Sequence, residues 1–371
     1  MNHKLIKYVG INYSVRNVVK IPKSINEAFS SDHAEEWREA VSCEMNSIKE
    51  NDVYDVVELP QGKKPIGVKW VFDFKKDLKG NITRFNARLV AKGFTQIFDS
   101  DYFDTFAPVA CSESIRLFLV LAHERNLVVK HWDFCTAFLA GDLEENIWMS
   151  QPPGFDDGTG RVWFLKKFLY GLKQASRAWN IKLANVLNKT GFKQLITDPC
   201  FFIKHEMMIV IHVDDLLCAI PSDTIAKEIY NQLENFLKLK DLGDVKYFLG
   251  IQIERNKLGF ILSQKVFIRD LLIATGMVDS KPVYSQMESL DKVLSSEFEI
   301  VTHHPYREII GKLNYLVNST RPDLSFSVSV LSRYCIGYGE LHWQAVKRIL
   351  RYLNGSQNFS LQLSDRTNWL Y

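Results

Sequence analysis

The chain has 371 residues, of which 46% are hydrophobic and 24% are charged, and its formal net charge is +3. This composition is typical of a globular protein with a large core, and the net charge by itself predicts no partner. No window approaches the ~20 apolar residues of a membrane span, and residues 1–20 lack the apolar core of a signal peptide, so we expect a soluble, intracellular protein. The six scattered cysteines have no zinc-binding spacing, which is typical of free thiols in a reducing compartment.

The first elements expected along the chain are a helix and a hairpin. Apolar residues at helical spacing predict a helix over roughly 34–49, and alternating apolar residues predict strands at 68–74 and 82–92 joined by a turn at 79–81. Since successive strand side chains point to opposite faces, Arg84, Arg88 and Lys92 share one positive face. That face is either solvent-exposed or a clamp for phosphates.

Helices and strands then alternate, and the last third is mainly helical. The expected elements are a helix at 112–125, a strand at 127–134, a helix at 176–189, a strand–turn–strand at 208–220, a helix at 224–237, a hairpin at 247–262, and helices at 264–275, 306–318, 322–334 and 341–353, with an irregular linker at 279–304. This order predicts an α+β body followed by a helical C-terminal part.

Charge is unevenly distributed along this nearly neutral chain. Residues 161–193 contain eight basic residues and no acidic one, and residues 61–95 contain nine basic residues against Asp73 and Asp77. Two such stretches indicate either a surface that faces a polyanion or two solvated faces.

Two adjacent carboxylates, Asp214 and Asp215, interrupt the apolar run 209–220. Burying two like charges is costly without a cation, but a hairpin can place the pair at its tip, facing a cleft. Because neighbouring strand residues point to opposite faces, the turn has to re-aim one of them. Carboxylate oxygens suit Mg²⁺. An ordinary surface turn would show the same pair, so the pair alone decides little.

A third carboxylate, Asp133, ends the β-rich run 128–133. Three carboxylates at strand ends could hold two metal ions about 3.5–4 Å apart, which suits nucleotidyl transfer because such ions stabilise both the attacking and the leaving oxygens. An isolated strand-end aspartate is usually a turn residue, so the prediction rests on the combination.

The segments that contain these carboxylates resemble motifs of copia-type reverse transcriptases. The motif segments are residues 133–144, 170–179 and 212–215, with flanking segments at 87–94, 105–109, 151–155, 320–323 and 350–353. They occur in the order of the family and span roughly residues 37–353. Four positions depart from the family pattern: His212 replaces an aromatic residue, Asn86 replaces a lysine, and Gln286-Met287 stands where Thr-Pro is common.

The resemblance implies an α+β right-hand polymerase fold with fingers, palm and thumb. It divides the chain into an N-terminal lead-in (1–27), fingers and palm (28–262), a helical thumb or connection region (263–362) and the truncated start of an RNase H domain (363–371). Because no further RNase H carboxylates follow, we expect no RNase H activity, and we expect either a polyprotein fragment or a reading frame left by a degraded element.

The resemblance also implies roles for single residues. Asp133, Asp214 and Asp215 would be the catalytic residues and hold two Mg²⁺ ions, for which Mn²⁺ could substitute. The dNTP would be bound by four residues: Arg88, Lys92, Phe138 and Gln174. Of these, Phe138 resembles the steric gate that excludes a ribose 2′-hydroxyl, although core packing would also explain it. The primer grip would consist of Phe248, Leu249 and Gly250.

The implied function is an RNA-directed and DNA-directed DNA polymerase of a copia-type retrotransposon. Its partners would be an RNA or DNA template–primer and dNTPs, with no membrane, and it would work in cytoplasmic virus-like particles and in the nucleus. The alternative is a catalytically inactive remnant that still binds nucleic acid. A two-metal nuclease is disfavoured because it has no use for Arg88, Phe138 and Gln174.

Overall fold

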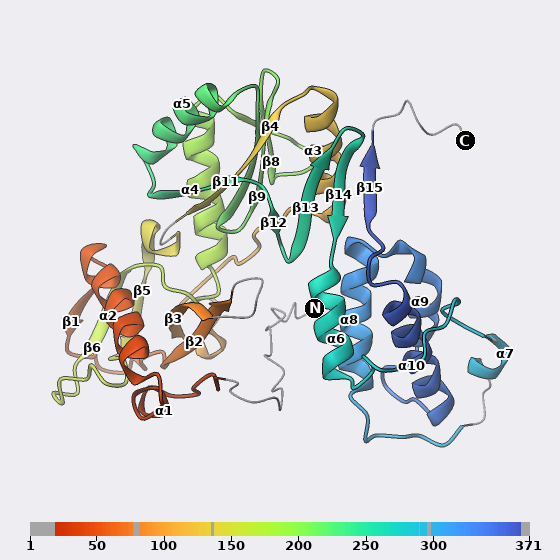
Figure 1. Ribbon diagram of the computed structural model, residues 1–371. Helices are drawn as coiled ribbons and strands as arrows, with labels where there is room; N and C mark the ends of the chain where they lie inside the picture. The colour runs from red at the N-terminus through yellow and green to blue at the C-terminus, as the bar shows by residue number, and fades with distance from the viewer. Residues whose placement is uncertain (1–18, 77–81, 135–136, 289, 295–297, 365–371) are drawn as a thin grey trace. The chain divides into compact units, whose positions relative to one another are not determined.

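The computed structural model describes residues 19–76, 82–134, 137–288, 290–294 and 298–364 (Figure 1). The chain forms two compact units. Within the described ranges, the larger unit takes residues 19–110 and 130–243, and the smaller unit takes residues 111–129 and 244–364. None of the described helices is both long and apolar enough to cross a membrane.

The larger unit begins with a helix on a hairpin. Its elements are α1 (Ile25–Phe29), α2 (Ala34–Glu50), β2 (Val68–Lys76) and β3 (Ile82–Ala91). The predicted helix and both predicted strands are confirmed; the predicted turn at 79–81 lies outside the described residues. Trp37 of α2 packs edge-on against Phe85 of β3, with ring centroids 4.6 Å apart. The helix therefore covers the apolar face of the hairpin, and Arg84 and Arg88 are exposed on the other face.

A three-stranded sheet follows that the sequence did not predict. Its strands are β1 (Tyr54–Val57), β6 (Val162–Lys167) and β5 (Asp142–Ser150), in the order β1-β6-β5. The register between β5 and β6 shifts between Asp142 and Ile147. The first half of β5 consists mostly of polar residues and none of them is buried, so it lacks the apolar alternation from which strands are predicted. Tyr54 stacks on Trp163 across β1 and β6, with ring centroids 3.6 Å apart.

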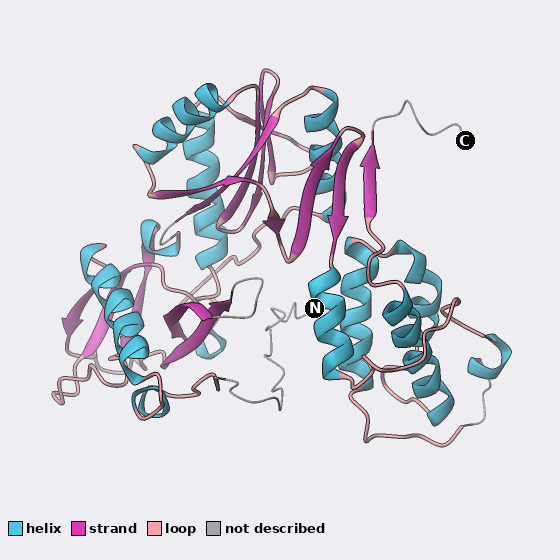
Figure 2. Ribbon diagram, in the orientation of Figure 1, coloured by secondary structure: helices cyan, strands magenta, loops and turns pink. Residues whose placement is uncertain are grey.

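The larger unit also contains a six-stranded sheet, and Figure 2 draws the strands in magenta. The order of its strands is β11-β4-β10-β9-β8-β7. Its strands are β4 (Val128–Phe134), β7 (Lys193–Gln194), β8 (Phe201–Lys204), β9 (Met207–His212), β10 (Asp215–Ile220) and β11 (Leu239–Asp244), and its helices are α4 (Ala175–Lys189) and α5 (Asp223–Glu234). Strands β9 and β10 are almost entirely buried, which explains why their sequence is a continuous apolar run. The edge strand β11 was not predicted because most of its residues are exposed and polar.

The smaller unit combines a four-stranded sheet with helices. Its sheet contains β12 (Tyr247–Phe248), β13 (Ile251–Asn256), β14 (Gly259–Ser263) and β15 (Leu361–Ser364), and its helices are α3 (Ser112–Glu124), α6 (Lys265–Ala274), α7 (Leu290–Val293), α8 (Tyr306–Ser319), α9 (Ser325–Ser332) and α10 (Glu340–Gly355). The predicted helices of this region are confirmed, and the expected linker contains the one-turn helix α7.

The helices of the smaller unit share one core of buried aliphatic side chains, including Leu313, Leu316, Val346 and Ile349. This packing explains their strong helical periodicity. The segment predicted to start an RNase H domain is described only at Leu363 and Ser364, which belong to β15 and pair with β14.

Candidate active site

Three carboxylates meet at one end of the central strands of the larger unit. Strands β9 and β10 form a hairpin in which His212 pairs with Asp215, so that Val213 and Asp214 make the turn. The neighbouring strand β4 reaches this turn, because the backbone N–H of Phe134 donates to the Asp214 carbonyl at 3.0 Å. Asp133, the preceding residue of β4, therefore lies beside the Asp214–Asp215 pair.

The turn has a strained backbone at Val213, whose φ is +56°. β-branched residues rarely adopt this left-handed conformation, and such strain is often found at functional sites. The indole Nε1 of Trp179 in α4 donates to the Val213 carbonyl at 2.8 Å and holds the turn in place. Adjacent residues of a regular strand point to opposite faces, and the turn at Val213 and Asp214 interrupts this alternation. The turn can therefore re-aim one of the two adjacent aspartates, as predicted from the sequence.

Electrostatics at Asp214 favour a bound cation. Burial, with Asp133 and Asp215 nearby, raises the pKa of Asp214 to about 6, although the hydrogen bond from Tyr170 and the charge of Arg88 act in the opposite direction. The Oδ1 atom of Asp214 is buried without a hydrogen-bond partner. A divalent cation would satisfy this oxygen and cancel the repulsion among the three carboxylates, so these residues fit a hard metal ion such as Mg²⁺.

Tyr170 contacts three of the residues singled out from the sequence. Its hydroxyl donates to Asp214 Oδ2 at 3.1 Å, its ring packs edge-on against Phe138 with centroids 4.6 Å apart, and the Arg88 guanidinium lies 5.2 Å from its ring centroid. Burial and the charge of Asp214 raise the pKa of Tyr170 above its ordinary value, so the hydroxyl stays protonated and can donate. No role was predicted for Tyr170, although it begins one of the family motifs.

The glycine after Tyr170 explains how the turn that contains Tyr170 comes so close to β3. The backbone N–H of Ala91 in β3 donates to the Tyr170 carbonyl at 2.8 Å. Gly171 has φ +93°, and a Cβ atom there would lie 2.2 Å from the Ala91 carbonyl oxygen. Glycine is therefore required for this approach, which places Tyr170 next to Arg88 on β3.

Two other predicted nucleotide-binding residues lie close to this point. Phe138 is buried in the short 3₁₀ helix Phe138–Ala140 that follows β4. Lys92 directly follows β3 and is half-buried, with its side-chain stem against Gly67. Their predicted roles in dNTP binding remain predictions.

Gln174 is held away from solvent by its own hydrogen bonds. It is buried, it accepts from Gln96 Nε2 at 3.0 Å, and its Nε2 donates to the Asp101 carbonyl at 2.9 Å. The amide of Gln174 thus fixes the loop around residue 101. Within the motif segment 170–179, the side chain that donates a described hydrogen bond to a catalytic carboxylate is Tyr170. A nucleotide contact by Gln174 remains a prediction.

Two histidines flank the carboxylates, and only His212 was noted from the sequence. His131 lies two residues before Asp133 on β4, and its Nε2 is 2.9 Å from Asp215 Oδ1. The spacing of two along a strand, which puts both residues on one face, is the signal that could have revealed it. Burial lowers the pKa of His212, which favours the neutral imidazole.

The predicted primer-grip residues belong to the smaller unit. Phe248 is buried at the end of β12, while Leu249 and Gly250 form the turn to β13 with φ of +51° and +76°. The Tyr315 hydroxyl donates to the Leu249 carbonyl at 2.6 Å and fixes this turn. Contact with a primer remains a prediction.

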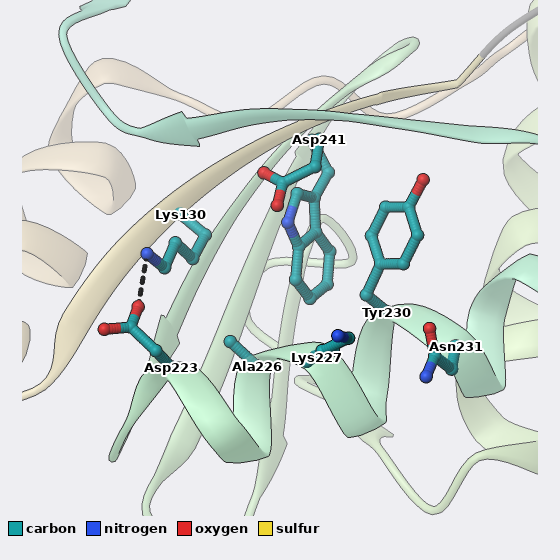
Figure 3. A pocket seen from close by; sticks show the side chains of 8 residues that line it. Lys130, Asp223, Ala226, Lys227, Tyr230, Asn231 and Asp241 are labelled. Carbon is teal, nitrogen blue, oxygen red and sulfur yellow. Dashed lines mark ion pairs between the residues drawn. The ribbon is translucent and has the colours of Figure 1, made fainter.

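A separate pocket of about 390 Å³ lies between α5 and strands β4 and β11 (Figure 3). Lys130, which pairs with Asp223 at 2.5 Å, and Trp132 line it. Because these residues alternate with His131 and Asp133 along β4, the pocket opens on the face of the strand opposite the carboxylates.

Residues 51–289 match the family described as reverse transcriptase (RNA-dependent DNA polymerase), and the chain therefore belongs to the reverse transcriptase family. The carboxylate site lies within the matched residues. The resemblance inferred from the motif segments is thereby confirmed.

Several similar proteins are Pol polyproteins of transposons. The chain is 40% identical over 337 residues to the retrovirus-related Pol polyprotein from transposon RE1 of Arabidopsis thaliana, which covers 89% of this chain and 23% of the polyprotein. It is 35% identical over 366 residues to that from transposon TNT 1-94 of Nicotiana tabacum (94% and 28%) and 37% identical over 350 residues to that from transposon RE2 of Arabidopsis thaliana (92% and 24%). The chain spans about a quarter of the length of these polyproteins.

Proposed function

We propose that this chain copies an RNA or DNA template by adding dNTPs to the 3′-hydroxyl of a primer. The observation that carries the proposal is the meeting of Asp133, Asp214 and Asp215 at one end of the sheet, with a buried Asp214 oxygen that has no hydrogen-bond partner. Mg²⁺ or Mn²⁺ bound by these carboxylates would supply Lewis-acid stabilisation of the transferring phosphoryl group.

The positive face of β3 would bind the triphosphate. Arg88 is exposed, and its guanidinium lies against the ring of Tyr170, whose hydroxyl donates to Asp214, so it is close to the carboxylates. A guanidinium makes bidentate, charge-assisted hydrogen bonds to phosphate oxygens, and it is always charged. Lys92 would add a second positive charge to the same phosphates.

Phe138 would select the sugar. An aromatic ring next to the sugar would clash with a ribose 2′-hydroxyl, which favours dNTPs over ribonucleotides. The edge-on contact between Phe138 and Tyr170 supports this assignment. Because the Tyr170 hydroxyl donates to Asp214, this contact holds the Phe138 ring near the metal-binding carboxylates. The same position of the ring would serve both core packing and sugar selection.

Tyr170 would act as a positioning residue. Its hydroxyl orients the Asp214 carboxylate through Oδ2, which leaves Oδ1 for the metal. Its ring also supports Arg88 and Phe138. The Tyr170 side chain would thus position three residues: the metal ligand Asp214, the phosphate-binding Arg88 and the sugar-selecting Phe138.

Primer extension on RNA and DNA templates with Mg²⁺ and dNTPs tests the proposal. We expect wild-type protein to extend the primer on both templates and Asp214→Asn to lose synthesis while still binding primer–template in a fluorescence anisotropy titration. Asp223→Asn is a matched control, because Asp223 faces Lys130 in the separate pocket; we expect it to retain synthesis. Wild-type protein that binds primer–template but adds no nucleotide would identify the inactive remnant instead.

A further inference from the structure

Two adjacent histidines and a glutamate meet in the smaller unit. His303 and His304 precede α8, and Glu340 is the first residue of α10. One potential ligand atom from each side chain, a ring nitrogen or a carboxylate oxygen, lies within 4.8 Å of the other two. The polymerase chemistry proposed above uses none of these residues.

Contacts to both the backbone and the ring of His304 hold its imidazole in place. The Tyr338 hydroxyl accepts from the His304 backbone N–H at 2.9 Å and donates to the His304 carbonyl at 3.0 Å. The imidazole stacks on Trp343 of α10, with ring centroids 4.4 Å apart and an interplanar angle of 13°. An isolated bridge between Val301 and Tyr338 ties the preceding backbone to the same segment. The imidazole is therefore oriented before any ligand binds.

Glu340 is oriented as well. Its Oε1 accepts from Gln344 Nε2 at 2.6 Å, one turn later in α10, and its Oε2 is 3.3 Å from His304 Nε2. These contacts hold the pKa of Glu340 below its usual value, so the carboxylate is charged at neutral pH. Hydrogen bonds of this kind, which orient a ligand through its second polar atom, are typical around metal ligands.

His303 supplies the third side chain. It is exposed to solvent, and its ring centroid is 3.9 Å from that of His304. A metal ion could therefore enter from solvent without any opening of the fold.

We propose that His303, His304 and Glu340 bind one Zn²⁺ ion, with water in the remaining coordination position. Two imidazoles and a carboxylate are a common zinc ligand set, whereas Mg²⁺ prefers oxygen ligands alone. Since Zn–N bonds are about 2.0–2.1 Å long, the rings would close slightly around the ion. The ion would join the segment before α8 to the start of α10 and so stabilise the helical part of the smaller unit.

Isothermal titration of the full chain with ZnCl₂, in excess Mg²⁺ to occupy oxygen-only sites, tests this proposal. We expect one zinc equivalent in wild-type protein. Loss of one ligand in His303→Ala or Glu340→Gln should weaken binding at least about tenfold, because even outer-shell changes cost this much. Visible absorption of Co²⁺ in place of Zn²⁺ should show a tetrahedral spectrum that both variants lose.

His205→Asn provides a matched control. His205 is an exposed histidine in the β8–β9 turn of the larger unit, with φ +54°, a conformation that asparagine tolerates. We expect this variant to bind zinc as wild type does. No zinc equivalent in wild-type protein, or equal affinity in wild type and both ligand variants, would overturn the proposal. Because none of these measurements uses nucleotide or template, they are independent of polymerase activity.

Discussion

Replacing Tyr170 by phenylalanine isolates the hydrogen bond to Asp214. The change removes the hydroxyl that donates to Oδ2 at 3.1 Å but keeps the ring that contacts Phe138 and Arg88. This bond stabilises the charged carboxylate, so its loss raises the pKa of Asp214 above the value of about 6 that burial and the neighbouring carboxylates already produce.

The size of the shift follows from the strength of the bond. A hydrogen bond to a charged group contributes about 1.5–3 kcal/mol, and one pKa unit corresponds to about 1.4 kcal/mol, so the pKa of Asp214 should rise by about one to two units. A protonated carboxylate is a poor metal ligand, because the proton and the ion compete for the same oxygens. As the pH is lowered, the affinity for divalent ions should therefore begin to decrease at a higher pH in Tyr170→Phe than in wild type.

Electron paramagnetic resonance measures the binding of Mn²⁺ to the protein directly. The titration would run from pH 5 to 9 without template–primer or dNTPs. The binding midpoint should lie higher by about one to two pH units in Tyr170→Phe, and the acid limb of primer extension should move the same way. Tyr230→Phe is the control, because that hydroxyl donates to the Leu239 carbonyl beside the separate pocket. Superimposed wild-type and Tyr170→Phe curves, or a shift to lower pH, would refute the reasoning.

Three further predictions test the site and its support. Asp214→Asn should unfold at a higher temperature than wild type at pH 8 without divalent ions, because the raised pKa means that ionised Asp214 destabilises the fold above pH 6; an unchanged or lower Tm by calorimetry would contradict this. Phe138→Val should increase ribonucleotide incorporation relative to dNTPs in single-nucleotide extension, and an unchanged ratio would argue against sugar selection. Gly171→Ala should lower the free energy of unfolding in urea by about 2 kcal/mol or more, because the new methyl group meets the Ala91 carbonyl at positive φ. In contrast, Gly311→Ala, in open space on α8, should raise it by up to about 1 kcal/mol; equal effects would undermine the steric argument.

Local patterns in the chain were enough to predict most helices and the hairpin that contains the aspartate pair. Apolar residues three and four apart define α2, α8 and α10, because each of these helices buries one face. The apolar run around Asp214 and Asp215 required a hairpin for electrostatic reasons, and the structure contains it as β9 and β10. These features depend on residues that are close together in the chain.

Strand pairing between distant segments was decided only in three dimensions. The order β11-β4-β10 brings Asp133 next to Asp214, although 80 intervening residues separate them, and it adds His131 to the site through Asp215. The same kind of long-range contact gave Tyr170 its bond to Asp214 and buried Gln174 against Gln96. The hydrophobic periodicity of the sequence does not predict such hydrogen bonds, because each joins residues that become neighbours only when the sheets and loops have packed.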